Sequence, residues 1–339
     1  MARPLASLGI DLDIYAFLDD SGYSGLYRRG LLLAKVAAMA RGAMRRWRDL
    51  ERACGHDVAL VHREIWPIVG EGPMRRLRRF HRRFVVDFDD AVWLQNVSEA
   101  NRAFVWFKPF DQAVALTRDA ATVSAGNPWL AEWARTQRPN RPREDVGVVP
   151  TAVDTTRWSP RPRGPGPLRL VWIGSHSTAR YLVPWLPAIA RLSAQHPDLE
   201  LHMIGAALEV PGIKIVQREW SYATEVEDVA RGDIGLAPLP DTEWARGKCG
   251  AKLLLYMALG LPAVASPVGV QAQIVSHGVD GLLAVDANAS EAALARLLGD
   301  PSLRASLGRA ARARVESEYS IMVAAPKLAA ILRRAAEGA

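Results

Sequence analysis

The stretch Lys252-Leu-Leu-Leu-Tyr-Met-Ala-Leu-Gly-Leu-Pro-Ala-Val-Ala-Ser-Pro-Val-Gly269 decides the fold class of this chain. The residues before Gly260 are apolar nearly all round, which is typical of a buried helix. Gly260 is suited to cap that helix, and Pro262 prevents its continuation. The apolar residues 263–266 then predict a strand, and Gly269 a turn. A buried helix, a strand and a glycine turn in succession indicate a parallel α/β sheet.

The same alternation of short apolar runs and amphipathic stretches extends along the whole chain. In the first half it predicts a long helix at 23–52 and strands at 8–17, 57–62, 84–88, 121–124 and 146–149. In the second half it predicts strands at 168–173, 199–204, 213–216, 234–238, 263–266 and 282–285. Helices are expected there at 179–195, 222–231, 248–260, 289–298 and 302–317. Four prolines and two glycines within residues 160–167 predict a linker between two α/β halves.

Length and composition fit a two-domain globular protein. The chain has 339 residues, about twice the usual size of one domain, with 49% hydrophobic and 23% charged residues. No apolar run reaches the roughly 18 residues of a membrane span, and the N-terminus lacks a signal-peptide pattern. The two cysteines, Cys54 and Cys249, lack metal-ligand spacing. We therefore expect no disulfide framework, no metal site and a cytoplasmic location.

The net charge of +7 comes mostly from arginines, which cluster at residues 45–48 and 75–83. Such clusters meet nucleic acid, anionic lipid or phosphorylated substrates, or form a solvated helix face. Neither aromatic interleaving nor a nucleic-acid module accompanies them, so no nucleic-acid partner is expected. The basic helix near 73–83 is suited to an anionic membrane surface, where each basic residue contributes about 1 kcal/mol. A solvated face and a peripheral membrane contact both stay open.

The segment 171–180 combines an apolar strand, a Gly-Ser turn and the start of a helix. Free N–H groups and the positive end of the dipole make a helix N-terminus a phosphate site. Gly174 permits close backbone approach to a ligand. The other candidate phosphate ligands of this segment are Ser175, Ser177, Thr178 and Arg180. The alternative interpretation of the hydroxyls is ordinary helix capping.

A second candidate anion site follows the predicted strand 234–238. Lys248 and Lys252, four residues apart, are expected on one face of the next helix, in its first turn. Lysines there oppose the helix dipole, which makes sense where an anion binds, although paired lysines on an exposed helix are common. Another glycine turn adds free N–H donors close by, at Val268, Gly269 and Val270.

At these residues the chain resembles family 4 of the glycosyltransferases, the glycosyl transferases group 1. The stretch 252–269, followed by 277–283, is similar to the donor-binding signature of that family. Residues 148–160 resemble its interdomain segment. The Gly174 loop resembles its phosphate loop, with Arg180 where many relatives have a lysine. The resemblance covers roughly residues 5–320.

The resemblance implies the GT-B fold, an α/β architecture of two Rossmann-like domains facing a cleft. It predicts an acceptor domain at 1–155, a linker at 156–167, a donor-nucleotide domain at 168–318, and a helix at 319–339 packing back on the first domain. A Rossmann half normally opens with a strand and a glycine-rich turn. Here the chain enters at what reads as the end of a helix, so the first strand of the acceptor domain is expected to be missing.

The activity implied by the resemblance is transfer of a sugar from a nucleoside diphosphate donor to a glycan, glycolipid or natural product. The acceptor would be a sugar, a lipid-linked molecule or a small molecule. The resemblance also implies retention of configuration, no metal, and no cofactor beyond the donor substrate. Since a diphosphate leaves, stabilising its charge is the main electrostatic task. The enzyme is expected in the cytoplasm or at the inner face of the membrane.

One departure from the family concerns two glutamates that its members carry eight positions apart. The matching positions hold Gly247 and Leu255, neither of which can hydrogen-bond through its side chain. Glu243 lies one turn away and is the candidate catalytic substitute for the first glutamate. The departure keeps open a second hypothesis, a non-catalytic nucleotide-sugar-binding relative or an inactive truncated product.

The first half contributes polar residues at the ends of two predicted strands. His62-Arg-Glu64 follows a strand at its carboxyl end, where α/β ligands bind. His62 is a candidate catalytic residue, and Arg63 and Glu64 are expected on the acceptor side; a polar surface turn is the alternative. Asp87-Phe-Asp-Asp90 superficially resembles a metal-binding Asp-x-Asp. Because the resembled family uses no metal, Asp89 and Asp90 are expected to orient the acceptor or to cap locally.

Overall fold

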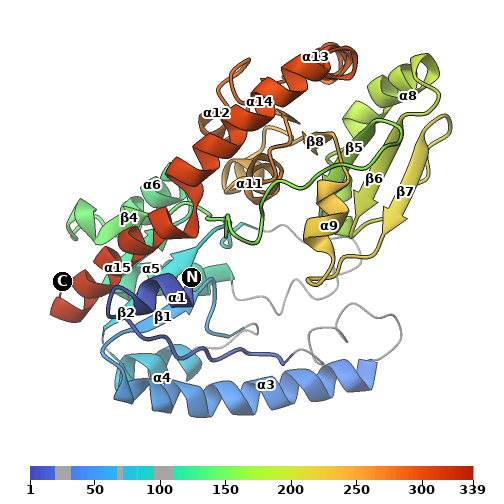
Figure 1. Cartoon of the computed structure of the whole chain (residues 1–339). Coiled ribbons are helices and arrows are strands. Elements are labelled where there is room, and N and C mark those ends of the chain that lie inside the picture. Colours follow the sequence, from blue (N-terminus) through green and yellow to red (C-terminus); the bar gives the residue numbers. More distant parts are fainter. Residues whose placement is uncertain (20–31, 67–71, 82, 95–109, 339) are drawn as a thin grey trace. The chain divides into compact units, whose positions relative to one another are not determined.

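A computed structural model describes residues 1–19, 32–66, 72–81, 83–94 and 110–338 of the chain (Figure 1). The chain divides into two compact units. The N-terminal unit comprises Met1–Gly126, Leu130–Val149 and Ala325–Ala339, and the C-terminal unit comprises Asn127–Trp129 and Pro150–Ala324. The last helix, α15 (Ile321–Glu337), therefore belongs mainly to the N-terminal unit.

The N-terminal unit is built on a parallel sheet with the strand order β1-β2-β3-β4. The strands are β1 (Ala59–His62), β2 (Phe84–Phe88), β3 (Thr122–Ala125) and β4 (Val146–Val148). The helical segments are α1 (Ala2–Ala6), α3 (Leu32–Arg52), η1 (Ala53–Gly55), α4 (Gly72–Phe80), α5 (Phe110–Asp119), α6 (Pro128–Thr136), η3 (Arg143–Asp145) and α15. All four residues of β3 are buried, as expected of a central strand covered on both faces.

The end of α15 packs directly on this sheet. Thr122 donates a hydrogen bond of 3.1 Å to the carbonyl of Ile331, and a side chain at Gly147 would collide with Ile331. Arg334 pairs at 2.8 Å with Asp145, which is only 1% exposed. The last helical turns are thus part of the core of the N-terminal unit.

The C-terminal unit has a six-stranded parallel sheet with the order β10-β9-β8-β5-β6-β7. The strands are β5 (Arg169–Ile173), β6 (Glu200–Ile204), β7 (Lys214–Arg218), β8 (Ile234–Ala237), β9 (Ala263–Ala265) and β10 (Leu282–Leu283). The helical segments are α7 (His176–Ala179), η4 (Val183–Trp185), α8 (Leu186–Gln195), α9 (Glu225–Ala230), α10 (Glu243–Arg246), α11 (Ala251–Ala258), α12 (Gln271–Ile274), α13 (Ala287–Gly299), α14 (Pro301–Arg314) and η5 (Val315–Tyr319).

Two apolar cores sandwich this sheet. On one face α8 and α13 contribute Ile189 and Leu294. On the other face α9, α11 and α14 contribute Val229, Met257 and Ala311. The strand order changes direction between β5 and β8, and such a switch point is where parallel α/β sheets bind ligands, beyond the carboxyl ends of the strands.

Three sequence-based predictions of elements are wrong. Residues 8–17 form no strand, because their alternating apolar side chains face no core; Ile14 is 77% exposed. In place of the helix expected at 179–195, α7 ends at Ala179 and is followed by the short η4 and by α8, since Pro184 and Pro187 restart the helix. The helix expected up to residue 317 ends as α14 at Arg314 and continues as the π-helical turn η5.

The helix expected at 23–52 is described from Leu32 onward, and residues 20–31 lie outside the described residues. Within the described ranges, every helix is too short or too polar to span a bilayer.

Candidate functional site

Two glycines meet beyond the carboxyl ends of β5 and β6, next to the switch point of the C-terminal unit. Gly174 follows β5 directly, and its N–H donates to the carbonyl of Ile204 at the end of β6. Gly205 follows β6 in the left-handed conformation, with φ of 81°. A side chain there would meet the Gly174 carbonyl. Both glycines are therefore needed for the close approach of two loops above the sheet.

Lys252 lies directly over the Gly174 turn. As the second residue of α11, it projects back towards β5, and its Nζ lies 3.1 Å from Thr178 Oγ1. The same Nζ lies 3.9 Å from the ring centroid of Trp172, a cation–π distance. A Cβ at Gly174 would overlap with Nζ. The predicted site residues Gly174, Thr178 and Lys252 thus converge on one point.

The electrostatic state of Lys252 suits an anion site. Burial, reinforced by the nearby charge of Lys248, lowers the pKa of Lys252 to about 7. No carboxylate within the described residues pairs with its ammonium group, whose hydrogen-bond partner is the hydroxyl of Thr178. A buried cation without a counter-charge is costly, and an incoming anion would remove that cost.

The hydroxyl groups after Gly174 form a cluster. Ser175 Oγ lies 2.9 Å from Ser177 Oγ, and Thr178 Oγ1 donates to the Ser175 carbonyl at 3.0 Å. The helix α7 that follows has only four residues, so its dipole is much weaker than the sequence suggested. Arg180 is exposed, and its guanidinium lies 5.3 Å from the ring centroid of Tyr181, without a described contact to Gly174 or Lys252.

The prediction that Lys248 and Lys252 share a helix face is wrong. Helix α11 begins only at Ala251, because Gly250 adopts a left-handed conformation with φ of 72° at its N-cap. Lys248 therefore lies before the helix, with its Nζ 5.2 Å from the ring centroid of Trp244. Its charge still contributes to the lowered pKa of Lys252.

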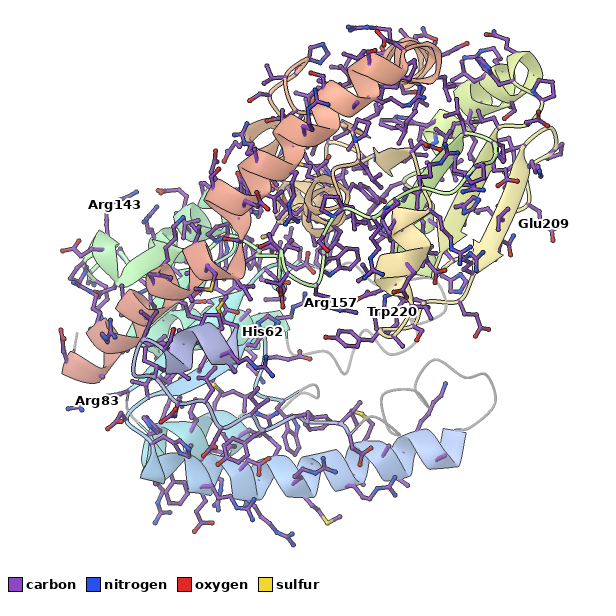
Figure 2. The ribbon with its side chains drawn as sticks, viewed as in Figure 1. His62, Arg83, Arg143, Arg157, Glu209 and Trp220 are labelled. Carbon is purple, nitrogen blue, oxygen red and sulfur yellow. The ribbon has the colours of Figure 1, made fainter. Side chains whose placement is uncertain are left out.

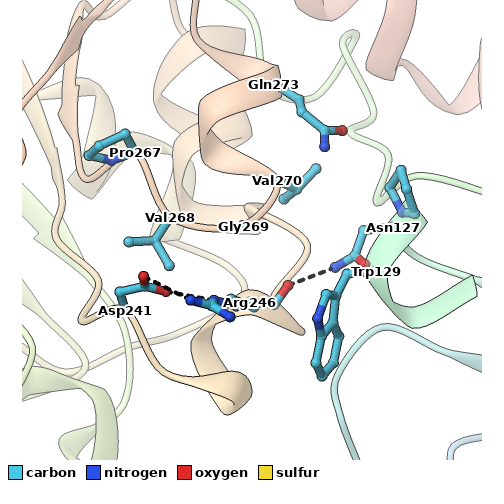
Figure 3. A pocket seen from close by; sticks show the side chains of 10 residues that line it. Asn127, Trp129, Asp241, Arg246, Pro267, Val268, Gly269, Val270 and Gln273 are labelled. Carbon is cyan, nitrogen blue, oxygen red and sulfur yellow. Dashed lines mark hydrogen bonds and ion pairs between the residues drawn. The ribbon is translucent and has the colours of Figure 1, made fainter. Parts of the chain in front are cut away.

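The turn of Val268, Gly269 and Val270 lines a pocket of about 310 Å³ in the C-terminal unit (Figure 3). Gly269 has φ of 55°, and a side chain there would lie 2.9 Å from the carbonyl of Arg246. Only glycine fits this approach between the β9–α12 turn and the end of α10. The remaining lining residues are Asn127, Pro128, Trp129, Asp241, Arg246, Pro267 and Gln273.

Asn127 lines this pocket although it is far in sequence from the Gly269 turn. Its side-chain amide donates to the carbonyls of Gly247 and Lys248 at 3.1 Å each. Arg246 pairs with Asp241 at 2.7 Å (Figure 3). Sequence reasoning missed these residues; the only available signal was an Asn-Pro-Trp triplet directly after a predicted strand.

Glu243 lies apart from these lining residues. It is exposed in the first turn of α10, which Thr242 caps through a hydrogen bond from the Ala245 N–H. The helix dipole stabilises a carboxylate in the first turn of a helix, so the position of Glu243 also has a purely structural explanation. Its catalytic role stays a prediction.

Trp220 is a further candidate that sequence reasoning missed. It follows β7, and its Cβ lies 3.2 Å from the position that a side chain at Gly205 would take (Figure 2). Its indole Nε1 donates to Glu225 at 2.8 Å, and Arg157 holds the other oxygen of the same carboxylate. The half-exposed ring is thus held in a defined orientation beside the two switch-point glycines.

In the N-terminal unit, a polar cluster forms where β1 and β2 end. His62 and Asp87 are direct neighbours in the parallel ladder, and His62 Nδ1 lies 2.7 Å from Asp87 Oδ2. Ser124, at the end of β3, donates to the other Asp87 oxygen at 2.6 Å. The hydrogen bond with Asp87 raises the pKa of His62, against the opposing effect of burial.

The next residue, Arg63, has a strained backbone with φ of 62°, rare outside glycine. Its guanidinium bridges Asp89 at 2.7 Å and Asp90 at 3.3 Å, and the Glu64 N–H donates to the His62 carbonyl. Burial raises the pKa of Asp89, but the Arg63 hydrogen bond and charge outweigh it and lower that pKa. The structure therefore brings the predicted residues of this half together.

Metal-binding geometry does not occur in this cluster or elsewhere in the described part of the chain: no three His, Cys, Asp or Glu side chains are grouped to hold an ion.

Residues 167–300 match the family of the glycosyl transferases group 1. That match contains the Gly174 turn, Lys252 and the Gly269 turn. No curated protein matches the chain significantly.

Solved structures similar to this chain have the GT-B fold. Anabaena HepE in complex with UDP and glucose superposes with a TM-score of 0.64 and 14% identity, over 98% of this chain and 88% of HepE. Sucrose-phosphate synthase from Thermosynechococcus elongatus has a TM-score of 0.60 and 17% identity, over 89% and 77%. A glycosyltransferase from Rickettsia africae has a TM-score of 0.61 and 13% identity, over 87% and 81%.

Proposed function

We propose that this glycosyltransferase moves a sugar from a nucleoside diphosphate donor to a hydroxyl group of a glycan, glycolipid or natural product. The reaction is proposed to retain the anomeric configuration and to need no metal. The observation that carries the proposal is the buried ammonium group of Lys252, which lies over Gly174 and beside Thr178 at the switch point. Charge develops on the leaving diphosphate, and a desolvated cation stabilises it strongly.

The base and the sugar of the donor are proposed from the neighbouring features. The ring of Trp220 is half exposed next to Gly174 and Gly205, so it is suited to stack on a base whose diphosphate contacts Lys252. HepE is known with UDP and with glucose. A uridine diphosphate sugar is therefore the first donor to test.

His62 is proposed to contact the reacting sugar or the acceptor hydroxyl. Asp87, itself held by Ser124, contacts the ring at Nδ1, whereas Nε2 lies 4.0 Å from Asp89 Oδ1, too far for a hydrogen bond, and is proposed to contact the ligand. Arg63, Glu64, Asp89 and Asp90 are proposed to shape the acceptor side of the same cluster. Because the carboxylates of this cluster outnumber its two basic side chains, His62 and Arg63, it favours a neutral, hydroxyl-rich acceptor over an anionic one.

The experiment compares Lys252→Met with Lys327→Met, which changes an exposed lysine of α15. Calorimetry with UDP should show a dissociation constant at least about 10-fold higher in Lys252→Met, because a hydrogen bond to a charged group contributes about 1.5–3 kcal/mol. Lys327→Met should bind like the parent. The proposal fails if a full panel of nucleoside diphosphates neither binds nor raises the melting temperature of the parent protein.

A non-catalytic relative remains the second candidate, favoured by one observation. The two positions at which relatives carry glutamates hold Gly247 and Leu255, and Glu243 does not line the pocket. This candidate predicts donor binding without hydrolysis or transfer from any donor that binds. Turnover of one bound nucleotide sugar, measured as released nucleoside diphosphate, would exclude it.

A further inference from the structure

Helix α3 exposes a continuous apolar stripe. Residues 36, 40, 44 and 47 are spaced by four, four and three positions and so share one helix face. Three of them are large and apolar, and their exposed fractions are 57% for Val36, 59% for Met44 and 43% for Trp47. Single exposed apolar residues are ordinary, but a stripe of them on one helix marks an interaction surface.

Arginines border this stripe. Arg41, Arg48 and Arg52 are exposed at spacings of seven and four, so they line one edge of it. On the neighbouring helix α4, Arg75 and Arg79 are exposed as well.

The acidic residues of α3 offset only part of this charge. Asp49 is buried and lies 3.8 Å from Arg52, and Glu51 is held at 2.7 Å by Arg76 of α4, whose guanidinium also stacks on Trp47 at 4.8 Å. The exposed surface of α3 is therefore apolar in its middle and positively charged at its edge.

Helix α4 by itself exposes less apolar and charged surface for docking than its sequence suggested. Arg76 is engaged with Glu51, and Arg78 pairs with Asp119 of α5. Its large apolar residues Met74 and Leu77 are buried in the unit. The apolar part of any docking surface thus comes from α3, and α4 only adds charge.

We propose that α3, together with Arg75 and Arg79, docks this protein on the surface of an anionic lipid bilayer. Val36, Met44 and Trp47 would enter the boundary between headgroups and acyl chains, and Arg41, Arg48 and Arg52 would contact lipid phosphates. This combination of a basic border and an apolar stripe containing tryptophan is what an interfacial helix requires. A nucleic acid would match the arginines but offers no apolar layer to Val36 and Met44. The proposal goes beyond the sugar transfer and does not depend on it.

The test is sedimentation of the full chain with vesicles of phosphatidylcholine, with or without 30% phosphatidylglycerol. We expect binding to the anionic vesicles only, and its release at high salt. Arg41→Gln with Arg48→Gln should lower the partition coefficient about 30-fold, since each arginine contributes about 1 kcal/mol. The matched control is Arg296→Gln with Arg309→Gln, which removes two exposed arginines of α13 and α14 and should change nothing.

Val36→Ser with Met44→Ser tests the apolar stripe separately. It should weaken vesicle binding while leaving salt-dependent retention on duplex DNA unchanged, and unaltered thermal melting would show that the fold is kept. The proposal is overturned if the parent protein does not sediment with anionic vesicles, or if the control pair weakens binding as much as the α3 pair. It is also overturned if the serine pair leaves vesicle binding intact, because the surface would then be a general polyanion site.

Discussion

Burial changes the charge state of Lys252 from that of an exposed lysine. Its ammonium group is desolvated by the helix that carries it and by Trp172, and the nearest polar partner is a neutral hydroxyl. The pKa of about 7 means that half of the molecules lose this charge near neutrality when no ligand is present. An anion that binds there favours the protonated form, so binding and proton uptake are coupled.

Diphosphate affinity should therefore depend on pH. As the pH rises from 7 to 9, protonation of Lys252 costs progressively more, and the dissociation constant of UDP should rise by up to about 10-fold per pH unit. Calorimetry in buffers of different ionisation enthalpy would show proton uptake on binding. In Lys252→Met this pH dependence should vanish; an unchanged profile would contradict the assignment.

The lowered pKa of Lys252 also affects the stability of the fold, which should rise with pH where the affinity for the diphosphate falls. The folded-state pKa of Lys252 lies below its unfolded value, so the unfolded chain binds more protons between about pH 7 and 10.5. The free energy of unfolding of the ligand-free protein should therefore gain from this residue as pH rises through that window. Denaturant titrations of the parent and of Lys252→Met at pH 7 and 9 would measure the difference.

Asp87 should control the protonation of His62. Asp87→Asn removes the carboxylate whose hydrogen bond raises the pKa of His62, so that pKa should fall, as measured by NMR of the imidazole. The raised pKa of His62 contributes to the stability of the fold below about pH 6.5, and this contribution is lost as the pH rises through the pKa of His62 in the folded state. Asp87→Asn should therefore lower the stability mainly in acid. Asp13→Asn, which removes the partner of His56, should leave the His62 signal unchanged.

At the scale of elements, the turns after β5, β8 and β9 determine what the C-terminal unit can bind. The parallel order places all three carboxyl ends at one edge, and glycines allow the following segments to approach each other. Gly269 is the clearest case, because both its positive φ and its contact with the Arg246 backbone exclude a side chain.

Gly269→Ala should consequently lower the free energy of unfolding by about 1–3 kcal/mol and weaken ligand binding in the pocket. Gly299→Ala is the matched control, since a side chain at the end of α13 meets no neighbour. Urea titration followed by circular dichroism measures both variants. Equal free energies of unfolding for the two variants would show that the turn accommodates a side chain at Gly269 without loss of stability.

At the scale of the whole molecule, the N-terminal unit is completed by the last segment of the chain. Ala329, Leu332 and Ala335 of α15 are buried in it, and the half-exposed Arg334 pairs with the buried Asp145, which also lies 3.8 Å from Arg138. The first and last parts of the sequence therefore have to fold together, although the whole C-terminal unit lies between them in sequence.

Deleting residues 325–339 should destabilise the N-terminal unit and leave the C-terminal unit folded. The deletion exposes the β4 surface at Gly147 and removes Arg334, which leaves the buried Asp145 with Arg138 at 3.8 Å as its remaining ion-pair partner. Loss of the shorter of two ion pairs to a buried carboxylate is destabilising. Hydrogen exchange should then accelerate in β1 to β4 and stay slow in β5 to β9. Fast exchange in both sheets would instead mean that the units unfold as one.

Local sequence was sufficient to predict most of the helices and strands and to recognise the resemblance to the family. Strand β2 occupies the predicted residues 84–88, and β5, β6 and β9 begin or end within one residue of their predicted bounds. Hydrophobic periodicity depends only on residues a few positions apart, so it can be read without the fold. The strand expected at 8–17 failed because periodicity does not reveal whether a core exists for the apolar side chains to face.

The sites depended on tertiary structure to a much greater degree. Motifs singled out Lys252, Gly174 and His62 as candidate site residues, but they did not predict the cluster that His62 forms with Asp87 and Arg63 forms with Asp89. The contact of Lys252 with Thr178, its lowered pKa, and the entry of Asn127 into the pocket were not. These contacts join residues 74 or more positions apart, and burial, which shifts the pKa of a charged group, exists only once distant segments have packed around it.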